Sequence, residues 1–160
     1  MSAVAAEEFR DVIGRFASGV TVITAAHEGR PFGTTASAVS SLSLEPPMLL
    51  ACLNRTSSTR AAIAAAGRFA VNILGEDQAD AALRFGRKGT DKFAGVAFAP
   101  GVAGAPLLAG ALATVECRVV EEVTGGTHSV FLAAVERAAA AAGMPLAYFR
   151  GRFGRLVLTP

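Results

Sequence analysis

Alternating apolar and polar residues between positions 111 and 122 place the strongest constraint on the fold. The apolar set at every second position is Ala111, Ala113, Val115, Cys117 and Val119. A period of two puts successive side chains on opposite faces of a strand. Gly125-Gly126 then marks a turn, and residues 129–135 form a second strand-like run. The sequence therefore predicts a long antiparallel hairpin with one apolar face and one half-wet face.

Residues 136–142 (ERAAAAA) give conflicting signals. Alanine is the strongest helix former, so propensity alone favours a helix. The partner of a long strand should instead stay extended until the next turn, here Gly143-Met144-Pro145. Because tertiary pairing often overrides propensity, we predict a strand.

Short apolar segments separated by turn residues account for most of the remaining chain. Strands are predicted at 20–26, 48–53, 69–74, 147–149 and 155–158, and helices at 7–17, 60–66 and 75–85. Residues 100–110 are predicted to be a loop. The first helix carries an apolar stripe at Phe9, Val12, Ile13 and Phe16. Strands outnumber helices and connections are short, which predicts one mainly β domain over 1–160, a closed or nearly closed antiparallel barrel with two or three short helices.

Composition and missing motifs exclude several classes of function. A net charge of +2 without a basic run argues against a nucleic-acid partner. No segment approaches the roughly 18 apolar residues of a membrane helix, and the N-terminus lacks the pattern of a signal peptide, so a cytoplasmic protein without a membrane partner is expected. With two histidines and two cysteines, a zinc site or a Ser-His-Asp triad has little material. If the protein is an enzyme, we expect an organic cofactor to supply the chemistry.

Residues 33–60 concentrate small side chains and hydroxyls. Gly33-Thr34-Thr35-Ala36-Ser37-Ala38 would let a flat ligand approach the backbone, and Asn54-Arg55-Thr56-Ser57-Ser58-Thr59 precedes a predicted helix. Hydroxyls and free N–H groups at a helix start can bind an anion such as a phosphate. The alternative is a Ser/Thr-rich strand pair followed by an ordinary helix cap, which the local pattern alone favours.

Several motifs, in order along nearly the whole chain, carry a family resemblance. Those in the first half are Phe9-Arg10-Asp11, Phe16-Ala17-Ser18-Gly19-Val20-Thr21-Val22, the Gly33–Ala38 segment, Ser41-Leu42-Ser43-Leu44-Glu45-Pro46-Pro47 and the Asn54–Thr59 segment. Those in the second half are Asp91-Lys92-Phe93-Ala94-Gly95, Cys117-Arg118-Val119, Gly126-Thr127-His128 and Tyr148-Phe149-Arg150-Gly151. With these motifs the chain resembles the flavin reductase-like family, the reductase components of two-component flavin-dependent monooxygenases.

This resemblance implies an antiparallel Greek-key split β-barrel that binds flavin and is normally a homodimer. The implied activity is that of an NAD(P)H:flavin oxidoreductase of the EC 1.5.1 type. It transfers a hydride from nicotinamide C4 to flavin N5 and supplies freely diffusing reduced FMN, or FAD, to a partner monooxygenase. FMN is the expected flavin and FAD is possible, and either NADH or NADPH would be the co-substrate.

The resemblance also implies roles for individual residues. The flavin ring and ribityl chain would lie against Thr35, Ala36, Ser37, Ala38 and Ser41. The phosphate would be held by the segment containing Asn54, Arg55, Ser57, Ser58 and Thr59, with Lys92 and Phe93 closing over it. The nicotinamide would meet His128, as the catalytic residue, and Tyr148, Phe149, Arg150 and Gly151. The chain departs from the family at Thr127, where an aspartate is common, and at Ala133-Ala134, where a glycine often stands.

Each of these roles has a plainer alternative. His128 could be satisfied by backbone groups at a strand start, Lys92 could be a solvated loop lysine, and Tyr148 could be a core aromatic residue. The same groove would also suit a non-catalytic flavin-binding protein, an electron-relay protein, or a barrel-fold interaction protein that binds no flavin.

Overall fold

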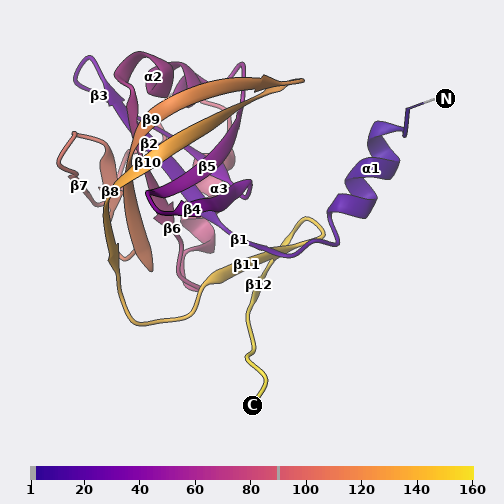
Figure 1. The fold of residues 1–160 in the computed structure, drawn as a ribbon. Coiled ribbons are helices and arrows are strands. Elements are labelled where there is room, and N and C mark those ends of the chain that lie inside the picture. Colours follow the sequence, from indigo (N-terminus) through magenta and orange to yellow (C-terminus); the bar gives the residue numbers. More distant parts are fainter. Residues whose placement is uncertain (1–2, 90) are drawn as a thin grey trace.

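The computed structural model describes residues 3–89 and 91–160, and its main feature is a seven-stranded antiparallel sheet. The strand order is β3-β2-β6-β9-β10-β5-β4 (Figure 1). The strands are β2 (Thr21–His27), β3 (Arg30–Ala36), β4 (Val39–Leu44), β5 (Pro47–Asn54), β6 (Arg68–Ile73), β9 (Ala113–Gly125) and β10 (His128–Ala140). The prediction of a mainly β, antiparallel fold is confirmed. No ladder joins the outer strands β3 and β4 within the described residues, so the strand order is open and a closed barrel is not seen.

Smaller elements flank this sheet. A second sheet has the order β1-β11-β12, and β7 pairs with β8 in a short hairpin. The bounds are β1 (Ser18–Gly19), β7 (Phe98–Pro100), β8 (Pro106–Leu108), β11 (Leu146–Phe149) and β12 (Arg152–Arg155). The helices are α1 (Ala6–Ile13), α2 (Ser58–Ala66) and α3 (Ala79–Gly86), in agreement with the two or three short helices expected.

The core lies between the inner face of the large sheet and α2. Ile63 of α2 packs with Phe69 and Phe131, whose ring centroids are 6.2 Å apart. Cys117 is buried and Val115 and Val119 pack against the same cluster, so the apolar face predicted for the long strand is confirmed. Burying this apolar area supplies most of the driving force for folding.

The alanine-rich segment is a strand, as pairing predicted. Ala138, Ala139 and Ala140 of β10 stand opposite Val115, Thr114 and Ala113 of β9. In the extended conformation these residues form ladder hydrogen bonds with β9, and this pairing outweighs the local preference of alanine for a helix.

Several boundaries differ from the prediction, and tertiary contacts explain three of the differences. Residues 100–110 contain most of the β7–β8 hairpin, because Gly101 and Gly104 build its turn and Phe98 pairs with Leu108. α3 begins at Ala79, since the backbone at Gly75 bridges to Pro145 and cannot also start a helix. The last strand is 152–155, because Arg150 and Gly151 form a tight turn with positive φ angles that brings Arg152 opposite Phe149.

Helix α1 projects away from the rest of the chain (Figure 1). It ends at Ile13, earlier than predicted, and none of its residues is buried. Phe9, Val12 and Ile13 are 59%, 62% and 51% exposed, and Phe16 just beyond it is 80% exposed. The predicted apolar stripe is therefore present, but none of the residues that the structure describes covers it.

Candidate functional site

The segment from Asn54 to Thr59 is a turn that leads from β5 into α2. The side-chain Oδ1 of Asn54 accepts hydrogen bonds from the N–H of Thr56 at 2.9 Å and from its hydroxyl at 2.7 Å. Ser57 is the N-cap of α2, and its hydroxyl accepts from the N–H of Arg60 at 3.4 Å. The N–H groups of Ser58 and Thr59 have no partner inside the helix, because a first turn lacks preceding carbonyls. This turn therefore offers backbone donors at the positive end of a helix dipole.

His128 begins β10 directly opposite Asn54 of β5. The N–H of Arg55 donates to the carbonyl of Thr127 at 3.0 Å, which ties the two segments together. The Thr127 hydroxyl lies 2.9 Å from Nδ1 of His128, and the imidazole is exposed. An uncharged hydroxyl thus contacts the ring at Nδ1.

The segment 35–41 runs from the end of β3 into β4. Ser37 and Ala38 form the connection, and the segment is rich in small side chains. The Thr35 hydroxyl donates to the carbonyl of Ala82 in α3 at 2.6 Å, so one side of this segment is anchored to a helix. The carbonyl of Ala38 accepts from the N–H of Cys52 at 2.9 Å, two residues before Asn54. Ser37, Ala38 and Ser41 are exposed. The structure therefore brings this segment next to the Asn54 turn.

Lys92 and Phe93 pack against Gly33 of β3, just before the segment 35–41. The ammonium of Lys92 donates to the carbonyls of Phe85 at 3.0 Å and Gly33 at 3.2 Å. Burial lowers the pKa of Lys92, because desolvation disfavours its charged form. The Phe93 ring meets the rings of Phe85 and Phe98 edge to face, with centroid distances of 4.9 and 5.2 Å. Lys92 is thus a partly buried connector between α3 and β3, not a solvated loop lysine.

Behind the Asn54 turn lies an ionic cluster of Arg60, Glu122 and Ser129. Arg60 Nε donates to Glu122 Oε1 at 2.7 Å and to the Ser129 hydroxyl at 3.2 Å. Burial alone would raise the pKa of Glu122, but the hydrogen bonds from Ser129 and Arg60 and the charges of Arg60 and Arg55 outweigh it, so the pKa lies below its usual range. Sequence reasoning missed this cluster, because Arg60 and Glu122 are 62 residues apart.

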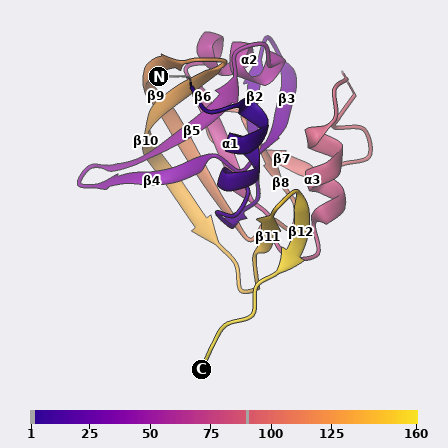
Figure 2. The same ribbon diagram turned by 90° about the vertical axis from the view of Figure 1, so that its right-hand side faces the viewer.

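The segment from Tyr148 to Gly151 lies elsewhere. It belongs to β11 and the turn into β12, and the Tyr148 ring packs with Phe153 at a centroid distance of 5.7 Å. In both ribbon views this small sheet lies at the opposite end of β10 from the β9–β10 turn (Figures 1 and 2). Within one chain, the structure therefore does not bring this segment next to His128.

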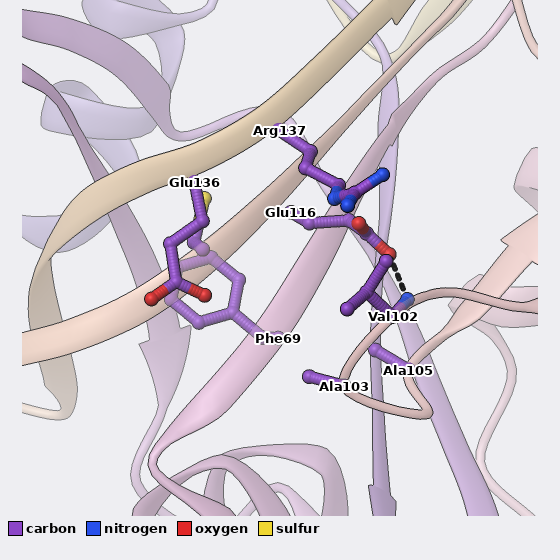
Figure 3. Close-up of a pocket in the computed structure, with 8 residues that line it drawn as sticks. Phe69, Val102, Ala103, Ala105, Glu116, Glu136 and Arg137 are labelled. Carbon is purple, nitrogen blue, oxygen red and sulfur yellow. Dashed lines mark hydrogen bonds between the residues drawn. The ribbon is translucent and has the colours of Figure 1, made fainter.

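Two cavities lie apart from all predicted site residues. The smaller, about 30 Å³, is lined by Phe69, Val102, Ala103, Ala105, Glu116, Cys117, Glu136 and Arg137 (Figure 3). Glu116 accepts a hydrogen bond there from the Val102 N–H at 2.8 Å. Desolvation, together with Glu136 and Glu116, raises the pKa of Cys117 to about 12, so this thiol stays protonated at neutral pH. The cavity holds about one water molecule and cannot take a flavin.

The larger cavity, about 400 Å³, shares Val102, Glu116 and Arg137 with the smaller one and continues along Pro100, Leu107 and Ala138. It lies between the β7–β8 hairpin and the β9–β10 ladder, away from the Asn54 turn. Over the described part of the chain, no group of three His, Cys, Asp or Glu side chains could hold a metal ion, and no helix is long and apolar enough to cross a membrane.

Comparison with known proteins identifies the family. Residues 13–156 match the model of the flavin reductase like domain. The chain belongs to this family. It is 56% identical over 150 residues to the reductase component of the 4-nitrophenol 4-monooxygenase/4-nitrocatechol 2-monooxygenase of Rhodococcus opacus, covering 94% of this chain and 80% of that protein.

Solved structures of flavin reductases share the fold of this flavin reductase-like chain. Nitrilotriacetate monooxygenase component B from Mycobacterium thermoresistibile matches with a TM-score of 0.92 and 39% identity, over 96% of this chain and 89% of that one. The NADH:FAD oxidoreductase SgcE6 of Streptomyces globisporus matches with a TM-score of 0.91 and 34% identity, over 99% of both chains.

Within this family member, the predicted flavin residues fall into two groups. In the first group, residues 39–41 lie on β4 and His128 lies on β10, on either side of β5, which leads into the Asn54–Ser58 turn. In the second group, Thr35 and Ala36 lie on β3 at the other edge of the strand order, where Lys92 and Phe93 pack against Gly33. Thr59 as a whole is only 1% exposed, so in the single chain the exposed Ser58 offers the accessible amide at the start of α2. The 148–151 segment stands apart.

Proposed function

We propose that this protein is an NAD(P)H-dependent flavin reductase that supplies reduced flavin to a partner monooxygenase. The observation that carries the proposal is the junction of the segment 37–41, the exposed Ser58 at the start of α2 and His128, along the connected strands β4, β5 and β10. Reductase components of monooxygenases are among its relatives, which supports this partner class.

The exposed residues fit a flavin. Ser37, Ala38 and Ser41 leave the backbone accessible to a planar ring, and no aromatic side chain occurs between Gly33 and Arg60. The Ser58 amide, the Asn54 turn and the cation of Arg55 would hold a phosphate. The ammonium of Lys92 has three N–H donors, and the carbonyls of Gly33 and Phe85 use two of them. The third would be free to bind the flavin phosphate, beside Phe93. A bound flavin would supply the redox chemistry, accepting a hydride from the nicotinamide C4 at N5.

The protein's own task is to position two planar rings, since hydride transfer needs them stacked at roughly 3–3.5 Å. His128 would orient the nicotinamide or stabilise negative charge on the reduced flavin. The Thr127 hydroxyl fixes the imidazole for that role from Nδ1, which leaves Nε2 facing outward. No protonating side chain is required for the transfer itself.

We propose FMN as the flavin, with FAD as the alternative to be tested beside it, because one relative is named an NADH:FAD oxidoreductase. Both NADH and NADPH stay as co-substrates to be tested: the Arg150 guanidinium lies 3.7 Å from Asp11, whereas Arg152 makes no ion pair among the described residues and could contact the extra phosphate of NADPH. The 148–151 segment is proposed to meet the nicotinamide in the dimer, where a second copy could bring it to a site.

A homodimer would cover the exposed apolar stripe. α1 has no buried residue, and on the outer face of the sheet Leu42 and Val120 are 46% and 55% exposed. Apolar patches of this extent usually mark an interaction surface. A second copy of the chain is proposed to pack there.

Anaerobic stopped-flow spectroscopy tests the proposed activity. The protein is mixed with NADH and a tenfold excess of FMN, and flavin absorbance is followed. Bleaching of all the flavin over many turnovers is expected for a reductase. A single event matching the protein concentration would identify an electron-relay protein, and no bleaching with FMN or FAD, together with no thermal shift, would identify a protein that does not use flavin.

A further inference from the structure

We propose that Arg60 and Glu122 are positioning residues, which hold the phosphate-binding turn of the flavin site in register with His128. This inference rests on the proposed function and assigns a role to residues outside the predicted site. It begins from the cluster of Arg60, Glu122 and Ser129.

The cluster joins three elements at one point. Arg60 lies in the first turn of α2, Glu122 in β9 and Ser129 in β10. Both Nε and Nη2 of Arg60 contact Glu122 Oε1, and Nε also reaches the Ser129 hydroxyl. Ser129 is 1% exposed, and the side chains of Arg60 and Glu122 are 30% and 25% exposed. A partly buried pair with shared hydrogen bonds holds its geometry better than a solvated surface pair.

The two sides of the proposed flavin site are attached directly to this cluster. On one side, the N–H of Arg60 is the group that the Ser57 cap accepts, so the start of α2 and the Arg60 side chain move together. On the other side, Ser129 follows His128 in β10. Fixing Arg60 against Ser129 therefore fixes the Ser58 amide relative to the backbone of β10 from which His128 projects.

The charges separate this role from that of a phosphate ligand. The carboxylate of Glu122 already neutralises Arg60. Arg55 also lowers the pKa of Glu122 by its charge, but it is exposed and makes no ion pair among the described residues, so its guanidinium can contact an anion directly. Arg60 would thus act through the turn, and Arg55 would act on the phosphate itself.

Riboflavin, which lacks the phosphate of FMN, distinguishes this role from a general loss of structure. Steady-state NADH oxidation gives kcat/KM for both flavins in the wild type and in Arg60→Met. We expect the wild type to prefer FMN, and Arg60→Met to lose about tenfold of kcat/KM for FMN, the equivalent of about 1.4 kcal/mol. Its value for riboflavin should stay within about twofold. Arg60→Lys, which can still pair with Glu122, should recover part of the preference.

Arg68→Met is the matched control, because Arg68 pairs with Glu136 of the same β10 strand but lies away from the turn. It should leave the FMN preference unchanged. Glu122→Gln repeats the test at nearly constant volume if Arg60→Met does not fold, as judged by thermal unfolding. If the folded Arg60→Met or Glu122→Gln variant keeps the FMN preference, or loses kcat/KM equally for FMN and riboflavin, the positioning role is wrong. The proposed flavin site is not affected by that result. A wild type that does not prefer FMN overturns the phosphate site, and this inference with it.

Discussion

Gly33 of β3 lies against the ring of Phe85 so closely that a β-carbon on Gly33 would stand 2.8 Å from two atoms of that ring. It would also lie 3.1 Å from Phe93. Phe85 is completely buried, so the ring has little room to retreat. Packing therefore requires a glycine at position 33. Without a side chain there, α3 and the Lys92–Phe93 segment can lie directly against β3, just before the segment 35–41.

Gly33→Ala should destabilise the protein by roughly 1–3 kcal/mol, the usual cost of overpacking a core. Chemical unfolding measures this change. Gly19→Ala is the matched control, because no atom lies within 4 Å of the added β-carbon. Equal stability of the two variants would show that the Phe85 ring can shift to accommodate the added β-carbon at little cost.

Lys92→Met should lower the free energy of unfolding by about 1–3 kcal/mol, since it removes charge-assisted hydrogen bonds to the Phe85 and Gly33 carbonyls. Lys88→Met, in the same loop but exposed, should change it by less than about 0.5 kcal/mol. FMN affinity at low salt, measured on both variants, tests the remaining donor. Unchanged affinity in Lys92→Met would remove Lys92 from the phosphate site while leaving its structural role.

Thr127→Val should reduce kcat/KM for NADH by roughly 2- to 10-fold, because a lost hydrogen bond is worth about 0.5–1.5 kcal/mol. His128→Ala should reduce it at least as much, and the double variant should be no worse than His128→Ala. Thr124→Val, an exposed threonine near the same turn, is the control. Wild-type KM and turnover in His128→Ala would exclude any role of this imidazole in catalysis.

Acid should weaken the Arg60–Glu122 cluster. The folded-state pKa of Glu122 lies below its ordinary value of 4.5, so its contribution to stability is complete above that pH and is lost as the pH falls through the folded value. Glu122→Gln should therefore be less stable than the wild type at pH 7, and the gap should narrow below about pH 4.5. Urea unfolding across pH 3–7 measures the gap, with exposed Glu121→Gln as control. A gap that does not change with pH would contradict this linkage.

The stripe on α1 predicts the oligomeric state. Replacing Phe9 and Val12 together by glutamate should convert a dimer to a monomer in sedimentation at micromolar concentration, because the charges would have to be buried against the second copy. Glu7→Lys, on the opposite side of the helix, should leave the dimer intact. A wild type that sediments as a monomer would refute the proposed interface.

The sequence by itself determined the elements whose signals are local. The alternation around Cys117 predicted a buried strand face, Gly67 ended α2 with a left-handed φ of 68°, and the order of short motifs pointed to the family. These features depend on period, turn chemistry and capping, which neighbouring residues specify.

Tertiary structure decided everything that depends on distant partners. It kept residues 136–140 extended through pairing with β9. It also hydrogen-bonded Lys92 to the carbonyls of Gly33 and Phe85, in a segment that the sequence suggested is a solvated loop. It also joined Arg60 to Glu122 across 62 positions and left the stripe of α1 uncovered. Contacts between residues far apart in the chain leave no periodic trace in the sequence, so only the folded arrangement reveals them.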